Sequence, residues 1–318
     1  MAQVVTVFGG SGFVGKQVVR ALAKQGWRIR VAVRHPVVAY DLKPMGDVGQ
    51  IQVVRCDVRK ESDIARALEG ADACVNLVGI LYQTLSQSFD AVQRAAAAYM
   101  AQVCAAKGIR NFVQVSALGA DGKSSSSYYA SKGRAEDSIR KLIPEAVIIR
   151  PSVIFGPQDS FFTSLARQVK MFPLMPAVGG GHTKFQPVYV GDVANAVGRT
   201  LGNDNARGVT YELGGPEVFE FKDLIKYVAN EVMQPRPLVY LPYFAASLIG
   251  IVGDIQASVL PIAPLLTSDQ VLMLQKDNVV TKGAKGLKDL GIAATAVESI
   301  VPTYLWRFRK NGQFAVPA

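Results

Sequence analysis

Histidine and cysteine are scarce in this chain. Its 318 residues include two histidines and three cysteines, and none of them stands at the spacing of a metal site. Cys56, Cys74 and Cys104 lie in apolar stretches, so we expect buried thiols in a reducing compartment. His35 and His182 have no sequence neighbours that would complete a ligand set. The sequence therefore predicts no metal.

Charge is also scarce. Charged residues make up 19% of the chain and hydrophobic residues 49%, whereas typical soluble domains are about a quarter charged. This composition excludes a disordered chain and indicates apolar surface reserved for a partner or a membrane. The net charge of +10 is uneven, because residues 1–150 hold 20 basic and 12 acidic residues. A basic first half favours a phosphate-bearing ligand, an acidic partner or anionic lipid over nucleic acid.

No targeting presequence is visible, because a strand-like run follows Met1 almost at once, and we expect a bacterial cytoplasmic protein. A membrane-spanning stretch is missing as well. The longest apolar run, within residues 241–266, has 13 residues where about 20 are needed. Two interpretations of this segment stay open: a buried helix, or a docking helix that faces a membrane or a hydrophobic partner.

The first half of the chain alternates strand and helix patterns. Apolar strand-like runs occupy residues 3–8, 28–33, 51–55, 72–77, 111–115 and 146–150. Helical patterns occupy residues 13–25, 61–69, 86–107 and 128–142. This alternation predicts an α/β fold with a Rossmann-type doubly wound parallel sheet. We assign residues 1–150 to this domain, with 187–206 returning to it, and residues 151–318 to a smaller mixed C-terminal lobe.

The first predicted strand runs directly into GGSGFVG, residues 9–15. Gly9 permits a tight turn, Gly12 lets the backbone approach a pyrophosphate, and Gly15 permits close helix packing. Phe13 and Val14 then begin a helix whose free N–H groups favour a phosphate. The pattern predicts a dinucleotide site.

Arg34 stands at the end of the second predicted strand, where an NAD site needs an acidic residue. An arginine there can pair with the 2′-phosphate of NADP, so we predict NADPH; the alternative is a solvated side chain. Asp57 and Val58 follow the third strand, where the carboxylate would contact the adenine edge or cap a turn.

Ser116, Tyr128 and Lys132 carry the pattern of a proton-transfer site. Ser116 ends the fifth predicted strand, and Tyr128 and Lys132 are one helical turn apart in YYASK. In a dehydrogenase the tyrosine would be the acid/base, with its pKa lowered by the lysine, and the serine would bind the substrate oxygen.

Together with the glycine loop, these residues resemble the short-chain dehydrogenase/reductase superfamily. The stretches SSSSYYASKGRAED, PEAVIIRPSVIFGPQDSF and QPVYVGDVANAV are similar to its atypical branch, and specifically to the NADPH-binding accessory subunits of respiratory complex I (NADH:ubiquinone oxidoreductase). The resemblance covers most of residues 1–215 and fades through the C-terminal lobe.

The resemblance implies a structural subunit in the electron-transport complex. Such a subunit binds NADPH without turnover near the junction of side arm and membrane arm, on the cytoplasmic face of the bacterial inner membrane or the matrix side of the mitochondrial one. Its partners are other complex I subunits. The cofactor contacts that it implies are Gly9, Gly12, Gly15, Arg34, Asp57, Gly79, Tyr128 and Lys132, and no catalytic residue is expected. We also expect Phe13, Val14, Val58 and Ser116 to contact the cofactor.

Other functions stay open. An active NADP(H)-dependent reductase or nucleotide-sugar epimerase would use Ser116, Tyr128 and Lys132, and an NADPH-sensing regulator would use the occupied site to control a partner. The lack of Lys and Arg within residues 237–266 counts against an epimerase. The ending YLWRFRK, residues 304–310, either contacts lipid or a docking partner or packs on its own lobe.

Overall fold

A computed structural model describes residues 3–259 and 264–315, and the chain divides into two compact units. The first unit consists of Met1–Pro151, Gly191–Leu213 and Gly283–Ile292, and the second of Ser152–Val190, Gly214–Lys282 and Ala293–Ala318. Residues 207–213 and 283–292 therefore belong to the first unit, although they were predicted in the C-terminal lobe. The reason is a strand, Thr210–Leu213, that extends the main sheet. Residues 187–190, which were predicted to return to the first domain, belong to the second unit.

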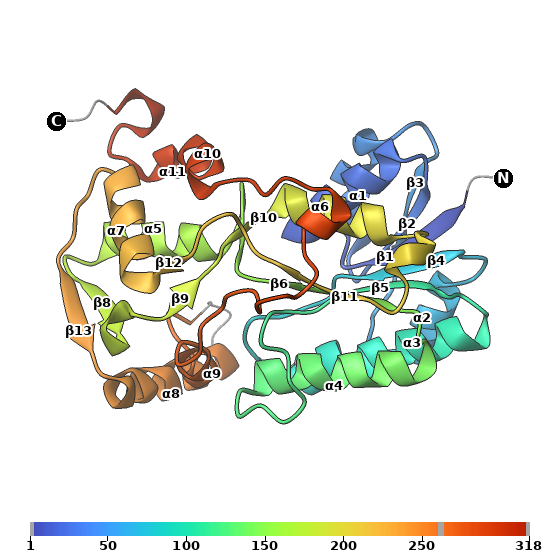
Figure 1. The fold of residues 1–318 in the computed structure, drawn as a ribbon, viewed down its shortest axis with the longest axis horizontal. Helices are drawn as coiled ribbons and strands as arrows, with labels where there is room; N and C mark the ends of the chain where they lie inside the picture. Colours follow the sequence, from blue (N-terminus) through green and yellow to red (C-terminus); the bar gives the residue numbers. More distant parts are fainter. Residues whose placement is uncertain (1–2, 260–263, 316–318) are drawn as a thin grey trace. The chain divides into compact units, whose positions relative to one another are not determined.

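The first unit is built on a seven-stranded parallel sheet, which confirms the predicted fold class (Figure 1). Its strand order is β11-β6-β5-β4-β1-β2-β3. The strand bounds are β1 Val4–Phe8, β2 Arg28–Val33, β3 Ile51–Arg55, β4 Ala73–Asn76, β5 Asn111–Val115, β6 Val147–Pro151 and β11 Thr210–Leu213. The central strands are almost entirely buried because helices cover both faces of the sheet.

Helices α1 and α6 lie on one face of this sheet, and α3 and α4 lie on the other (Figure 1). The helix bounds are α1 Phe13–Lys24, η1 Pro36–Met45, α2 Glu61–Ala67, η2 Asp90–Ala95, α3 Ala96–Ala106, α4 Ser127–Leu142, α6 Val190–Thr200, η4 Asp204–Ala206 and η5 Lys288–Leu290. The helix predicted over 86–107 begins only at Asp90, and its first turn is π-helical. The three cysteines are free and buried, as predicted.

The second unit packs helices against short strands around an aromatic core that includes Phe155, Phe162 and Phe185. Its strands are β7 Ile154–Phe155, β8 Met175–Val178, β9 Lys184–Phe185, β10 Val188–Tyr189, β12 Phe219–Glu220 and β13 Leu238–Leu241. Its helices are α5 Phe161–Met171, η3 Gly179–Gly181, α7 Phe221–Glu231, α8 Tyr243–Val259, α9 Ser268–Met273, α10 Val297–Ile300, α11 Pro302–Leu305, η6 Trp306–Phe308 and η7 Gly312–Phe314.

Helix α8 carries its large side chains outward, so the interpretation of residues 241–266 as a buried helix is wrong. The buried positions of α8 are small: Ala246, Gly250, Gly253 and Ala257. They recur at helical spacing, and the two glycines face the backbone of residues 266–268, where an added Cβ at Gly253 would lie 1.9 Å from the Leu266 carbonyl oxygen. The exposed apolar side chains are Phe244, Leu248, Ile249, Ile251, Val252, Ile255 and Val259. Residues 260–263 of this segment lie outside the described part of the chain.

The segment 304–310 packs on its own unit. The Tyr304 ring is buried and its hydroxyl donates to the buried carboxylate of Asp159 at 2.5 Å. Burial raises the pKa of the Asp159 carboxyl, and burial with the neighbouring Asp159 raises the pKa of Tyr304. Arg307 stacks on Tyr304, while Arg309 donates to the carbonyl and carboxylate of Glu231. Tyr304 is 5% exposed and offers almost none of its ring to a partner, whereas Trp306 of the same segment is exposed.

Candidate dinucleotide-binding site

The glycine loop lies where the strand order of the sheet reverses. The chain leaves β1 for β2 and β3 on one side and then returns to β4 on the other side of β1. Ligands of open parallel sheets bind outside the carboxyl ends of the strands at such a point. Gly9 follows β1, and an added Cβ there would lie 3.2 Å from the Leu77 carbonyl carbon just after β4. The two strand ends are therefore in close contact at the site.

The three glycines of the loop differ in their surroundings. Gly9 has a φ of +79°, which an L side chain rarely adopts. At Gly15 a Cβ would lie 2.3 Å from the Gly9 carbonyl oxygen, so only glycine fits between the loop and α1. At Gly12 a Cβ would meet only that oxygen, at 3.4 Å, and the residue is exposed. Gly12 is the N-cap of α1 and offers no side chain to the first-turn N–H groups, which leaves them for an anion. This cradle fits a pyrophosphate.

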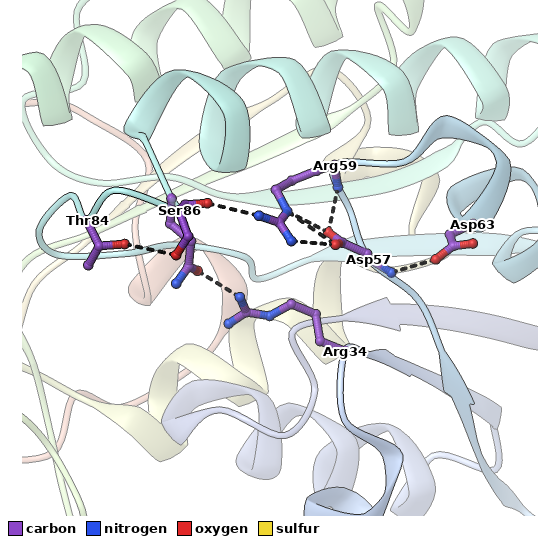
Figure 2. A network of polar contacts seen from close by, with 7 residues as sticks. Arg34, Asp57, Arg59, Asp63, Thr84 and Ser86 are labelled. Atoms are coloured by element: carbon purple, nitrogen blue, oxygen red, sulfur yellow. Dashed lines mark hydrogen bonds and ion pairs between the residues drawn. The ribbon is translucent and has the colours of Figure 1, made fainter. Parts of the chain in front are cut away.

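Arg34 and Asp57 come together at the ends of β2 and β3 (Figure 2). The exposed Arg34 donates to the Gln87 side-chain oxygen at 2.9 Å. Asp57 pairs through both carboxylate oxygens with Arg59, and the shorter contact, from Nη2 to Oδ2, is 2.6 Å. The hydrogen bonds from Arg59 lower the pKa of Asp57 to about 2, with a further contribution from the charge of Arg34. The site thus holds two guanidinium groups around one ionised carboxylate.

Lys132 projects from α4 to the ends of β4 and β5. Its side chain is 4% exposed, and its ammonium lies 3.4 Å from the Val115 carbonyl oxygen and 3.5 Å from that of Val78. A Cβ added to Gly79 would lie 3.3 Å from the same nitrogen, so the predicted residues Gly79 and Lys132 are in contact. Burial lowers the pKa of Lys132 to about 8, against the opposing effect of the Glu136 carboxylate.

Ser116 is bound to a buried carboxylate. Its hydroxyl donates to Oε1 of Glu136 at 2.5 Å, and the Glu136 side chain is 1% exposed. Arg150 donates to both oxygens of the same carboxylate, at 3.0 and 2.7 Å. A hydroxyl has a single proton, so Ser116 retains only acceptor capacity for anything else. Ser116 as placed cannot donate a hydrogen bond to a substrate oxygen.

Tyr128 lies in the first turn of α4, on the same face as Lys132. Its half-buried ring packs edge-on against Phe89 and Tyr129, at centroid distances of 5.7 and 5.6 Å. Aromatic packing therefore fixes this ring.

Phe13, Val14 and Val58, the three further predicted cofactor contacts, differ in how deeply they are buried. Phe13 and Val14 form the half-buried first turn of α1, whereas Val58 is buried in the core behind Asp57. Val58 therefore supports the position of Asp57 from the core.

Glu136 and Arg59 were not predicted as site residues. Glu136 lies four residues after Lys132, so helical spacing already placed both on one face of α4. Arg59 lies two residues after Asp57, which is close enough for a local ion pair. Both signals were present in the sequence, but only the structure shows that these two side chains contact predicted site residues.

Within the described ranges, residues 3–259 and 264–315, no group of three or more His, Cys, Asp or Glu side chains could hold a metal ion. No helix within them combines the length and the apolar character needed to cross a membrane.

Comparison with known proteins identifies relatives over nearly the whole chain. A family model described as NAD(P)H-binding matches residues 9–160. The Arabidopsis thaliana protein named NADH dehydrogenase (ubiquinone) 1 alpha subcomplex subunit 9, mitochondrial, is 34% identical over 316 residues, which cover 97% of this chain and 79% of that protein. A protein of Caulobacter vibrioides named ceramide reductase is 34% identical over 175 residues, 55% of this chain and 54% of its own.

Among solved structures, an Escherichia coli NADPH-dependent quinone oxidoreductase in complex with NADPH shares the fold, with a TM-score of 0.73 and 19% identity over 93% of this chain and 98% of its own. The match to the family model and the relationship over most of the Arabidopsis protein confirm the resemblance seen in the sequence. The chain belongs to the NAD(P)H-binding, short-chain dehydrogenase/reductase-like family that includes subunit 9 of the alpha subcomplex of NADH dehydrogenase (ubiquinone).

Proposed function

We propose that this chain is a non-catalytic, NADPH-binding accessory subunit of respiratory complex I that stabilises the junction of the side arm and the membrane arm. The Arabidopsis relative over 97% of this chain is named a subunit of NADH dehydrogenase (ubiquinone), and this relationship supports the assignment to the complex. The position at the junction would place the chain on the cytoplasmic face of a bacterial inner membrane, or on the matrix side of a mitochondrial one.

NADPH is the proposed cofactor because of the end of β2. Arg34 provides a positive charge and planar donors where a 2′-phosphate would lie, and no carboxylate stands at that position. Gly12 and the first turn of α1 would receive the pyrophosphate, and Tyr128 with Lys132 would hold the nicotinamide ribose.

The observation that carries the non-catalytic proposal is the hydrogen bond from Ser116 to Glu136. A carbonyl reductase needs a donor to the substrate oxygen as charge develops on it. Here the serine proton is directed at a buried carboxylate that Arg150 also holds in place. Redirecting it would leave a buried charge with one fewer hydrogen bond, which is costly. The pair of Tyr128 and Lys132 therefore serves cofactor binding in this proposal.

Helix α8 is the proposed docking element. Its outward apolar side chains form a surface without any Lys or Arg, since residues 237–266 contain none. A surface of this kind fits an apolar partner, namely membrane-arm subunits and the acyl region of the lipid around them. It does not suit binding through anionic headgroups alone.

The test uses a tagged chain expressed in its own organism and recovered from gently solubilised membranes. We expect the wild type to co-purify with complex I, and the L248E/I255E variant to be recovered free while still binding NADPH. The control is Val48→Glu, a fully exposed position of the first unit, which should co-purify like the wild type. Recovery of the wild type as a free monomer would overturn the proposal.

An active reductase is the second candidate, because Tyr128 and the buried Lys132 lie on one face of α4 and a relative over half the chain is named a ceramide reductase. In that case Tyr128→Phe would abolish NADPH oxidation by a carbonyl substrate while NADPH still binds. We expect instead that neither ketones, quinones nor ceramide precursors oxidise NADPH on the wild type. Measurable oxidation that Tyr128→Phe removes would establish the enzyme.

A further inference from the structure

Asp57 presents an electrostatic problem for the proposed cofactor. It lies at the end of β3, next to the end of β2 where Arg34 would bind a 2′-phosphate. Because the pKa of Asp57 is held near 2, this carboxylate is ionised at neutral pH and cannot be neutralised by a proton. An unpaired negative charge there would repel a phosphate that carries about two negative charges itself.

Arg59 offsets most of the negative charge of Asp57. Its Nε and Nη2 contact both oxygens of Asp57, and its backbone N–H donates to Oδ1 as well, so one residue holds the carboxylate from two directions. Bidentate pairing of this kind fixes geometry in addition to offsetting charge. With Arg59, the local balance of Arg34, Asp57 and Arg59 is one net positive charge; without it, the balance is zero.

The two arginines are also held on one turn of the chain (Figure 2). Residues 84–87 form a tight turn that is closed by two backbone hydrogen bonds between Thr84 and Gln87. Arg59 donates to the Ser86 carbonyl oxygen at 2.9 Å, and Arg34 donates to the Gln87 side chain at 2.9 Å. The bond to Gln87 uses one of the five N–H donors of Arg34, so the turn positions the guanidinium without consuming it.

We propose that Arg59 is a second determinant of NADPH specificity: it neutralises Asp57 and, with the 84–87 turn, leaves Arg34 free to bind the 2′-phosphate. This inference rests on the proposed NADPH function and adds to it a residue that does not itself touch the phosphate. Arg59 is thus a positioning residue, and its effect belongs to NADPH and not to NADH, which lacks the phosphate.

The test measures dissociation constants for NADPH and NADH on the purified full chain by calorimetric or fluorescence titration. We expect the R59Q variant to lose about tenfold of the preference for NADPH over NADH, because one unscreened charge a few ångströms from the phosphate has roughly this effect. Affinity for NADH should change little. The R59K variant, which keeps the charge, should retain most of the preference, and added salt should reduce the difference between wild type and R59Q.

A double variant separates charge from folding. D57N/R59Q removes both the carboxylate and its cation, so its preference for NADPH should return to near the wild-type value. Thermal melting identifies any R59Q protein that has lost its fold, and D57N/R59Q then carries the test alone. Equal losses of NADPH and NADH affinity in R59Q, or no rescue in D57N/R59Q, would overturn the role of Arg59. A wild type that prefers NADH would overturn the NADPH proposal itself.

Discussion

Gly12 and Gly15 differ in what an added methyl group would meet. At Gly15 the group would collide with the loop itself, whereas at Gly12 it would only touch the Gly9 carbonyl oxygen, at 3.4 Å, beside the first turn of α1. Substitution of Gly15 therefore tests folding, and substitution of Gly12 tests the approach of a ligand.

We predict that Gly12→Ala lowers NADPH affinity at least tenfold, because its Cβ would occupy the space through which a pyrophosphate reaches the backbone. The free energy of unfolding should fall by no more than about 1 kcal/mol, the usual difference between glycine and alanine at an N-cap. The measurements are NADPH titration and urea unfolding. Gly122→Ala, in a surface loop away from the glycine turn, is the control and should bind normally; unchanged affinity in Gly12→Ala would contradict the proposed position of the pyrophosphate.

The lowered pKa of Lys132 predicts how the unfolding free energy of the chain depends on pH. The pKa is about 8 in the folded chain and 10.5 in an unperturbed lysine, so the folded state binds fewer protons than the unfolded state between these values. The unfolding free energy of the cofactor-free chain should therefore rise with pH in this window, and it should gain nothing from this group below about pH 8. Urea unfolding at pH 8 and pH 9.5 measures the rise.

Lys132→Met should remove that rise with pH, whereas Lys123→Met, at an exposed position, should keep it. Bound NADPH adds negative charge near the ammonium and should flatten the slope in the wild type. If Lys132→Met showed the same pH slope as the wild type, the ammonium would not be buried as described.

At the scale of elements, α8 illustrates how small residues can determine which face of a helix is buried. Gly250 and Gly253 lie against backbone atoms of residues 266–268, and their lack of side chains lets α8 approach α9 closely. The bulky side chains are left on the outside as a consequence.

We expect Gly253→Ala to destabilise the second unit by roughly 1 to 3 kcal/mol, because its Cβ would lie within 2 Å of a carbonyl oxygen and the helix must shift. Binding of NADPH by the first unit should be retained. Ser258→Ala, at a half-buried position one turn later on α8, is the matched control and should melt like the wild type. A Gly253→Ala protein with unchanged thermal stability would refute the close packing of α8.

Elements were predictable from sequence wherever their burial was uniform. Six strands of the sheet were found because each is an apolar run, but β11, with the sequence TYEL, was missed. Its Glu212 is 9% exposed and lies 3.7 Å from Arg150, and a charged residue in a buried strand hides the strand pattern. The sequence left open whether α8 is buried or exposed, because a helix that is apolar all round gives no amphipathic signal.

In the candidate site, features that depend on local spacing were predictable, and contacts between distant residues were not. The glycine loop, Arg34, Tyr128 and Lys132 were predicted because their chemistry depends on local spacing. The partner of Ser116 was not, since its contact with Glu136 joins residues 20 positions apart through a strand and a helix.

At the scale of the molecule, the chain combines a glycine turn that fits a pyrophosphate with an exposed apolar surface on α8. The glycine turn lies in the first unit, and α8, the proposed docking element, belongs to the second. We expect NADPH to raise the unfolding free energy of the first unit by mass action, so the chain with bound NADPH should melt at a higher temperature than the chain stripped of it.

The most direct measurement is cofactor analysis of native complex I purified with this chain and held in steady-state turnover with NADH and quinone. The proposed function predicts one NADPH per copy of the chain, retained and still reduced after many turnovers, and density for it at residues 9–15 in the same preparation. NADPH that is oxidised at a rate comparable with turnover, or a complex that contains the chain with no NADPH at all, would contradict the central claim.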